Sequence, residues 1–195
     1  MEIMGKFTAI GMRTAEKSLP SKRMIINTCG RNDTADKGDI STWVWCNPTN
    51  RAITHTYEDI QAVSVECLWQ GTKILKSNYG YLDCLDTDKP DPITLNGDWR
   101  RGKGRQPKGA YGGPDKPLIT NPGAARRAIY LPAYRNLVAH WEQDSEVREW
   151  LAVCRAFDGH VFLRDHDTGR GLDRNGPMSH AWLLCMYLND GVWPL

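Results

Sequence analysis

The sequence lacks the features by which membrane proteins, disulfide-rich secreted proteins and zinc-binding modules are usually recognised. No stretch reaches the roughly 18 consecutive apolar residues of a transmembrane helix, and the first residues carry no apolar run of signal-peptide length. The six cysteines are widely spaced and form no C-x-x-C pair, in a chain of 195 residues. We therefore expect a cytoplasmic protein with reduced cysteines, no metal, no cofactor and no membrane partner.

An excess of charge of either sign is also absent. The formal net charge is only +2, so the overall electrostatic field does not indicate a nucleic-acid-binding protein, and any such role needs a local patch. Internal repeats are absent too. A chain of this length buries roughly 70% of the surface that its unfolded form exposes, which predicts one domain spanning residues 1–195.

Hydrophobic periodicity predicts several helices and a few short strands. Apolar residues at three- and four-residue steps predict a helix from about 58 to 76. Later helices are predicted from about 121 to 141, with a kink or restart at Pro132, from about 145 to 154 and from about 177 to 189. Strands are predicted at 23–29, 42–46 and 160–165. The expected fold class is α+β, a helix-rich single domain around a small β-sheet.

A long stretch without periodicity separates the first helix from the later ones. Residues 86–121 hold five prolines and six glycines, and we predict a long, mobile, basic loop rich in glycine and proline. Such loops are commonly functional. Its basic part includes Arg101, Lys103 and Arg105 between glycines, a composition that suits phosphate, and Trp99 could stack on a base. A solvated flexible loop explains the same composition equally well.

The predicted helix at 58–76 carries a narrow polar stripe. Glu66, Gln70 and Lys73 stand at i, i+4 and i+7, which places them within about 60° of one another around a helix axis. Apolar residues border this stripe on both sides, a pattern that favours the lining of a pocket. A surface ladder of Glu, Gln and Lys is the alternative.

A second polar group follows the predicted strand at 160–165. Asp165, His166 and Asp167 stand at its end, where catalytic carboxylates are common. Three interpretations are open: an acid pair for sugar or phosphate chemistry, a metal site that also uses His160, and a turn whose carboxylates accept local backbone hydrogen bonds.

Residues 64–73, S-V-E-C-L-W-Q-G-T-K, resemble a known family. The match is to the S-V-E-x-x-(aromatic)-Q-x-x-K helix of the NADAR/YbiA-like superfamily, small α-rich domains that cleave N-glycosidic bonds of ribose-containing compounds. Lys103–Arg105, then Asp165–Asp167 and Asn175, are similar to later family elements in the same order. Cys67 replaces the histidine that usually follows the glutamate, and the family's Trp-Gly pair is missing, so the chain resembles a divergent member.

The resemblance implies an N-glycosidase acting on an ADP-ribosylated or phosphoribosyl compound, with modified nucleic acid as a further substrate. Glu66 would stabilise the ribosyl cation, or Lys73 would form a Schiff base with an opened ribose, and Asp165 or Asp167 would move protons or hold ribose hydroxyls. The implied substrate-binding residues are Trp69, Gln70, Trp99, Arg101, Lys103, Arg105 and Asn175. The alternatives are a non-catalytic nucleotide, ADP-ribose or RNA binding module, and a metal-dependent hydrolase centred on Asp165, His166 and Asp167.

Overall fold

The structure is a computed structural model, and it describes residues 5–29, 41–42, 44–75, 93–95 and 107–194. In chain order these residues form β1 (Phe7–Gly11), η1 (Glu16–Ser18), β2 (Arg23–Asn27), β3 (Ser41–Thr42), η3 (Val44–Cys46), β4 (His55–Tyr57), β5 (Ile60–Ala62), α1 (Val65–Gly71), β6 (Lys73–Leu75), β7 (Ile93–Leu95), β8 (Pro107–Ala110), α2 (Pro122–Ala125), η5 (Arg126–Tyr130), α3 (Leu131–Trp141), α4 (Ser145–Ala156), β9 (His160–Asp165) and α5 (His180–Asp190). The mixed composition of helices and small sheets confirms the predicted combination of α and β structure.

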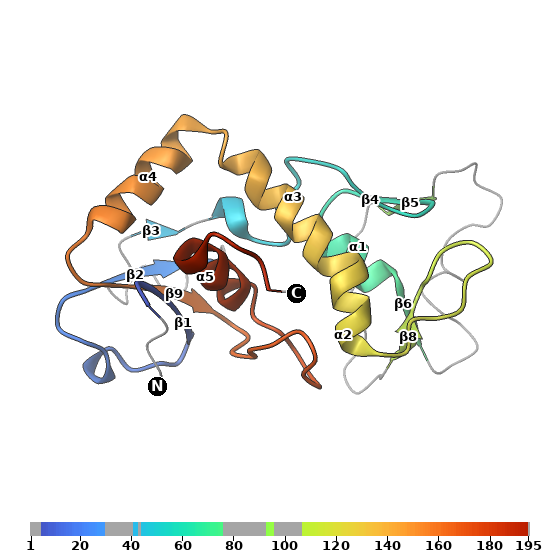
Figure 1. Cartoon of the computed structure of the whole chain (residues 1–195), viewed down its shortest axis with the longest axis horizontal. Helices are drawn as coiled ribbons and strands as arrows, with labels where there is room; N and C mark the ends of the chain where they lie inside the picture. The colour runs from blue at the N-terminus through green and yellow to red at the C-terminus, as the bar shows by residue number, and fades with distance from the viewer. Residues whose placement is uncertain (1–4, 30–40, 43, 76–92, 96–106, 195) are drawn as a thin grey trace. The chain divides into compact units, whose positions relative to one another are not determined.

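The chain divides into two compact units (Figure 1). The terminal unit joins residues 1–47 to residues 141–195, and the middle unit comprises residues 48–140. The terminal unit therefore brings together the two ends of the sequence. The single domain over residues 1–195 stays a prediction.

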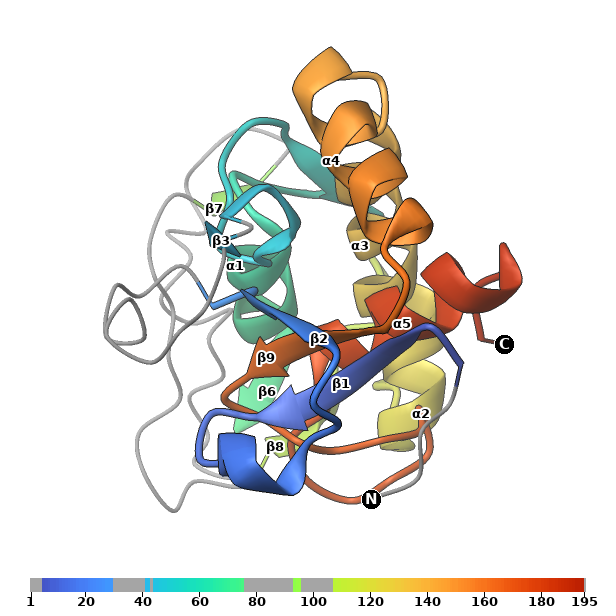
Figure 2. The same cartoon turned by 90° about the vertical axis from the view of Figure 1, so that its left-hand side faces the viewer.

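A parallel sheet forms the centre of the terminal unit, with the strand order β1-β9-β2-β3 (Figure 2). Strand β9 lies between β1 and β2 and is parallel to both. It is buried at every position from Val161 to Asp165 because a central strand of a parallel sheet is covered on both faces. All carboxyl ends of these strands consequently meet at one edge of the sheet.

Helix α5 packs against β1 and β9 and runs antiparallel to them. At its C-terminal end, Asn189 exchanges two hydrogen bonds with the backbone of Phe7, at 2.9 and 2.8 Å. At its N-terminal end, His180 and Ala181 contact Asp165, the last residue of β9. The first turn of α5 thus lies at the carboxyl edge of the sheet.

In the middle unit, the described residues form two further small sheets and the helical segments α1, α2, η5 and most of α3. One sheet has the order β4-β5-β7, and the other pairs β6 with β8 in antiparallel fashion. Helix α1 packs against β4, β5, β7 and η5. Its residues Val65, Cys67 and Leu68 are buried in this core. Their burial determines which side of the helix carries the polar residues.

The helix predicted over 58–76 is wrong in extent, because α1 covers only Val65–Gly71. Before it, Glu58 takes a left-handed backbone conformation, with φ of 51°, in the tight turn between β4 and β5. Ser64 is extended and caps α1 by accepting a hydrogen bond from the Cys67 N–H. After it, the chain pairs with β8 as strand β6. The apolar residues at 60 and 74 therefore belong to strands.

Other predicted elements agree with the structure to different degrees. The strands at 23–29 and 160–165 are confirmed as β2 and β9. The strand at 42–46 is wrong beyond Thr42, because residues 44–46 form the 3-10 turn η3. Strands β7 and β8 lie inside the segment 86–121, which was predicted to have no regular structure.

Capping residues mark where the helices after residue 121 begin. Asn121 and Asp144 accept backbone hydrogen bonds at the starts of α2 and α4. Pro132 does not end the helix, because the preceding residues form a π-helical turn in which the Leu131 N–H donates to the Arg126 carbonyl. Helix α5 begins at His180 because the Ser179 hydroxyl accepts from the Trp182 N–H.

His55 gives the middle unit an expected pH dependence. Its side chain is buried, and neither ring nitrogen has a hydrogen-bond partner among the described residues. Burial lowers the pKa of His55 from 6.5 to about 4. The native state therefore resists protonation while the unfolded chain accepts the proton, so stability present above pH 6.5 is lost as the pH falls towards 4.

We expect this single group to cost about 3 kcal/mol of unfolding free energy between pH 7 and pH 4. A His55→Leu variant, apolar and of similar size, should lack that loss. Urea unfolding of both proteins at several pH values measures the difference. Unfolding free energies that decrease equally with falling pH in the two proteins would show that His55 does not cause the loss of stability.

Candidate functional site

Three predicted side chains form a hydrogen-bonded row on the polar side of α1. The Gln70 amide Nε2 donates to Glu66 Oε1 at 2.8 Å, and Lys73 Nζ donates to Gln70 Oε1 at 2.8 Å. All three residues are half-buried. Lys73 lies beyond the helix, yet it stays on the same side because Thr72 keeps helical backbone angles, φ −80° and ψ −6°. The predicted stripe exists as a set of contacts, and its role as the lining of a pocket stays a prediction.

An aromatic wall borders this row. Lys73 Nζ lies 4.5 Å from the ring centroid of Trp69, within the range of a cation–π interaction. Trp69 meets Tyr130 edge to face with ring centroids 5.7 Å apart, and Tyr130 stacks on Tyr134 at 5.9 Å. These rings come from α1, η5 and α3, so the helical segments of the middle unit together fix the position of Trp69.

The arrangement supplies an oriented carboxylate beside a fixed cation and an aromatic face. Gln70 holds one oxygen of Glu66, and Oε2 accepts no hydrogen bond from any described residue. A half-buried carboxylate with a free oxygen can stabilise a positive charge that develops on a ligand. The Trp69 ring offers a surface on which a planar base can stack.

The other predicted site residues lie in the other unit or outside the described residues. Asp165, Asp167 and Asn175 are in the terminal unit, and Asp165 is buried whereas the other two are exposed. Trp99, Arg101, Lys103 and Arg105 lie outside the described residues. The part of the site that the structure brings together is thus Glu66, Trp69, Gln70 and Lys73.

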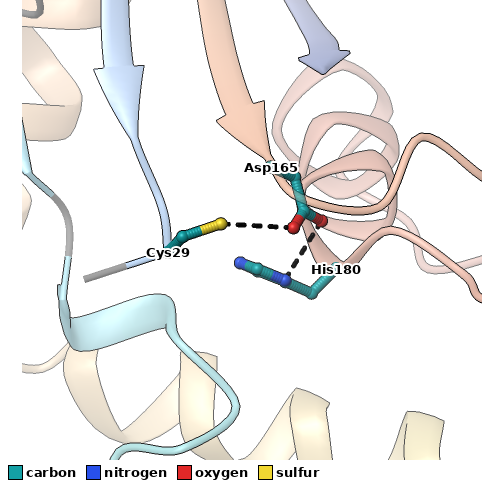
Figure 3. Close-up of side chains that lie close together, drawn as sticks. All are labelled: Cys29, Asp165 and His180. Atoms are coloured by element: carbon teal, nitrogen blue, oxygen red, sulfur yellow. Dashed lines mark hydrogen bonds and ion pairs between the residues drawn. The ribbon is translucent and has the colours of Figure 1, made fainter. Parts of the chain in front are cut away.

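Asp165 belongs to a second polar group, at the carboxyl edge of the parallel sheet (Figure 3). Its Oδ2 lies 3.1 Å from His180 Nδ1 and accepts from the Ser179 hydroxyl at 2.6 Å. Its Oδ1 accepts from the Cys29 thiol at 3.3 Å. On the far side of the imidazole, His180 Nε2 lies 3.1 Å from the Thr28 carbonyl oxygen.

These contacts shift the pKa values of Asp165, His180 and Cys29. Burial alone would raise the pKa of Asp165, but His180, the Ser179 hydroxyl and the Ala181 N–H hold it well below its usual range. Burial alone would lower the pKa of His180, but the Asp165 charge, with hydrogen bonds to Asp165 and Thr28, raises it. Burial and the Asp165 carboxylate raise the pKa of Cys29 to about 12. The Asp165 carboxylate thus faces an imidazole whose pKa it raises, beside a thiol that stays protonated at neutral pH.

The contacts correct one interpretation of the sequence. A metal site built from Asp165, His166, Asp167 and His160 is wrong, because His160 begins β9 and Asp165 ends it, about 16 Å apart along the strand. His166 and Asp167 are exposed. The residues that gather around Asp165 are Cys29 and His180.

Sequence analysis did not single out Cys29 or His180. The sequence does predict the two strands that carry Cys29 and Asp165, since the strand at 23–29 ends at Cys29 and the strand at 160–165 ends at Asp165. Their parallel pairing would have placed the two residues at the same edge. To predict that His180 lies at this edge, the position of α5 would also have to be known, and the local sequence does not encode that position.

Comparison with known proteins places the chain in a family. The model of a family of unknown function, DUF6939, matches residues 50–184, so the chain belongs to that family. No curated protein and no solved structure matches the chain. Among the described residues, no helix is long and apolar enough to cross a membrane. The resemblance to the NADAR/YbiA-like superfamily stays a prediction.

Proposed function

We propose that the protein is an N-glycosidase that cleaves the C1′–N bond of an ADP-ribosylated or phosphoribosyl compound. The observation that carries the proposal is the half-buried Glu66 carboxylate, which Gln70 orients and whose second oxygen accepts no hydrogen bond from any described residue. The S-V-E-x-x-W-Q-x-x-K pattern supports the same assignment and extends it to a NADAR/YbiA-like fold.

The reaction makes Glu66 an electrostatic catalyst. As the C1′–N bond breaks, its electron pair leaves with the base, and positive charge spreads over C1′ and the ring oxygen of the ribose. The Glu66 carboxylate faces that charge and stabilises the transition state more than the substrate. Water then adds to C1′, its proton passes to solvent or to a neighbouring base, and the leaving base takes up a proton.

Lys73 acts in this proposal as a fixed cation. Its ammonium group donates to Gln70 and lies over the Trp69 ring, and both interactions favour the protonated form. A Schiff base needs the neutral amine instead. The geometry thus favours the carboxylate route over covalent lysine chemistry.

Lys73→Arg separates the two routes. Arginine keeps the charge, the hydrogen-bond donor and the contact with Trp69 but cannot form an imine, so turnover should stay within about tenfold of wild type. Borohydride added during turnover should leave no adduct on Lys73 of the wild-type protein. Complete loss of activity together with a substrate-dependent adduct would establish the imine route.

The remaining predicted residues have subordinate roles in the proposal. Arg101, Lys103 and Arg105 would hold the phosphate groups, and Trp99 would stack on the base or on adenine. Asp165, Asp167 and Asn175 stay predicted as proton-transfer or ribose-binding residues. The substrate class fits a cytoplasmic protein, as does the finding that no described cysteine forms a disulfide.

The proposal is tested by incubating the full-length protein with a panel of ADP-ribosylated guanine nucleotides, ADP-ribosylated DNA and phosphoribosyl compounds. We expect free base and the matching ribosyl product in equal amounts from at least one of them. Saturable binding of these compounds with no base released from any would support a binding module and refute the enzyme. Tight, steeply salt-dependent binding of random RNA would refute it in favour of nucleic-acid recognition.

A further inference from the structure

Three potential metal ligands from three separate segments converge at the carboxyl edge of the parallel sheet. Cys29 follows β2, Asp165 ends β9 and His180 begins α5 (Figure 3). Their ligand atoms, Sγ, a carboxylate oxygen and an imidazole nitrogen, all lie within 4.8 Å of one another. Proteins with open parallel sheets bind their ligands at the carboxyl edge of the sheet. Here β9, which carries Asp165, lies between β1 and β2.

We infer that Cys29, Asp165 and His180 bind one divalent zinc ion. Thiolate, imidazole and carboxylate are the three side-chain types that bind zinc in proteins, at about 2.0–2.3 Å. Tetrahedral coordination at those lengths separates neighbouring ligand atoms by about 3.3–3.8 Å. Sγ lies 3.3 Å from Oδ1 and Nδ1 lies 3.1 Å from Oδ2, close to these separations. A pair of ligand atoms at the 4.8 Å limit would have to close by about 1 Å.

The surroundings of the three ligands favour coordination. A metal-bound histidine usually donates its other ring N–H to a carbonyl or carboxylate, and His180 Nε2 has the Thr28 carbonyl at 3.1 Å. Ligand carboxylates are themselves held by hydrogen bonds, and Asp165 Oδ2 accepts from the Ser179 hydroxyl. The His166 N–H donates to Cys29 Sγ at 3.2 Å, a contact that also suits a thiolate.

Burial and access are consistent with a zinc site. Asp165 and His180 are buried, with 3% and 8% of their surface exposed, whereas Cys29 is half-buried next to the exposed His166. An ion can therefore enter from the side of Cys29.

On coordination the thiol and the imidazolium each lose one proton to solvent, and zinc takes the place of both protons between the three groups. Three protein ligands also leave one position for water, as in zinc sites that remain open.

Cobalt provides the sharpest test, because Co²⁺ occupies zinc sites and a cobalt–thiolate bond gives a charge-transfer absorption that nitrogen and oxygen ligands do not. We expect the full chain, stripped of metal, to develop this band with one equivalent of Co²⁺ and to lose it on addition of Zn²⁺. Cys29→Ser should abolish the band, since serine keeps the size and the hydrogen bond to Asp165 but not the sulfur ligand.

The matched control is Cys154→Ser, which removes another thiol of the terminal unit from helix α4. It should keep the full band and the zinc stoichiometry, and circular dichroism of both variants checks that they are folded. No thiolate band in the wild-type protein at excess Co²⁺ would overturn the inference. So would a band that survives in folded Cys29→Ser. The cobalt band and its loss in Cys29→Ser are read without any substrate, so the failure of zinc binding and the failure of the glycosidase proposal are separate results.

Discussion

Glu66→Gln should lower turnover on a cleaved substrate by about 10²–10³-fold while changing its dissociation constant little. Glutamine keeps the size of the side chain and can still accept the hydrogen bond from the Gln70 amide. It lacks the negative charge that faces the ribosyl cation, and this charge matters in the transition state far more than in the bound substrate. Single-turnover rates and equilibrium binding, measured on the same preparation, separate the two effects.

Glu58→Gln is the matched control for this substitution. Glu58 is in the same unit and forms an ion pair with Lys116 at 2.9 Å, and no hydrogen bond between described residues joins it to the Glu66 row. The loss of such a largely solvent-exposed pair costs little, so turnover should stay at the wild-type level. An equal loss of turnover in both variants would show a general effect of charge or stability. Full activity in Glu66→Gln would remove Glu66 from the mechanism.

Asp165→Asn should destabilise the terminal unit by about 3–5 kcal/mol, the usual result of removing one partner from a buried ion pair. Asp165 is only 3% exposed, and asparagine would leave the buried His180 imidazole against an amide instead of the carboxylate that raises its pKa. The Ser179 hydroxyl and the Ala181 N–H would then face an amide with one acceptor oxygen. Urea unfolding followed by far-ultraviolet circular dichroism measures the loss.

Two further variants test the origin of that loss. Asp167→Asn changes an exposed carboxylate two residues away and should shift stability by no more than about 0.5 kcal/mol. Adding His180→Gln to Asp165→Asn removes the second buried charge and should recover part of the loss. Equal effects of Asp165→Asn and Asp167→Asn would contradict the buried pair.

The Glu66 row could be predicted from the sequence because it depends on local geometry. Residues four and seven apart share one side of a helix, and Thr72 extends the helical turn far enough for Lys73 to reach Gln70. The length of the helix could not be predicted from the same periodicity. Ile60 and Ile74 match a helical spacing, but one lies in β5 and the other in β6.

The Cys29–Asp165–His180 group could not be predicted because it depends on the topology of the sheet. Cys29 and Asp165 are separated by 136 positions, and they meet only because β9 inserts between β1 and β2 in parallel. The sequence around β1 carries no alternation that marks it as a strand. Without β1, the position of α5 and hence of His180 at this edge has no local indication.

A crystal structure of the Glu66→Gln variant with uncleaved substrate bound would test the central claim most directly, since the slow variant preserves the bond to be broken. The measurement is the distance from the ribosyl C1′ atom to the side-chain oxygen at position 66. We expect this distance to be about 3–3.5 Å, with the base or the ribose against Trp69. A substrate bound with C1′ far from position 66 would contradict the proposed site.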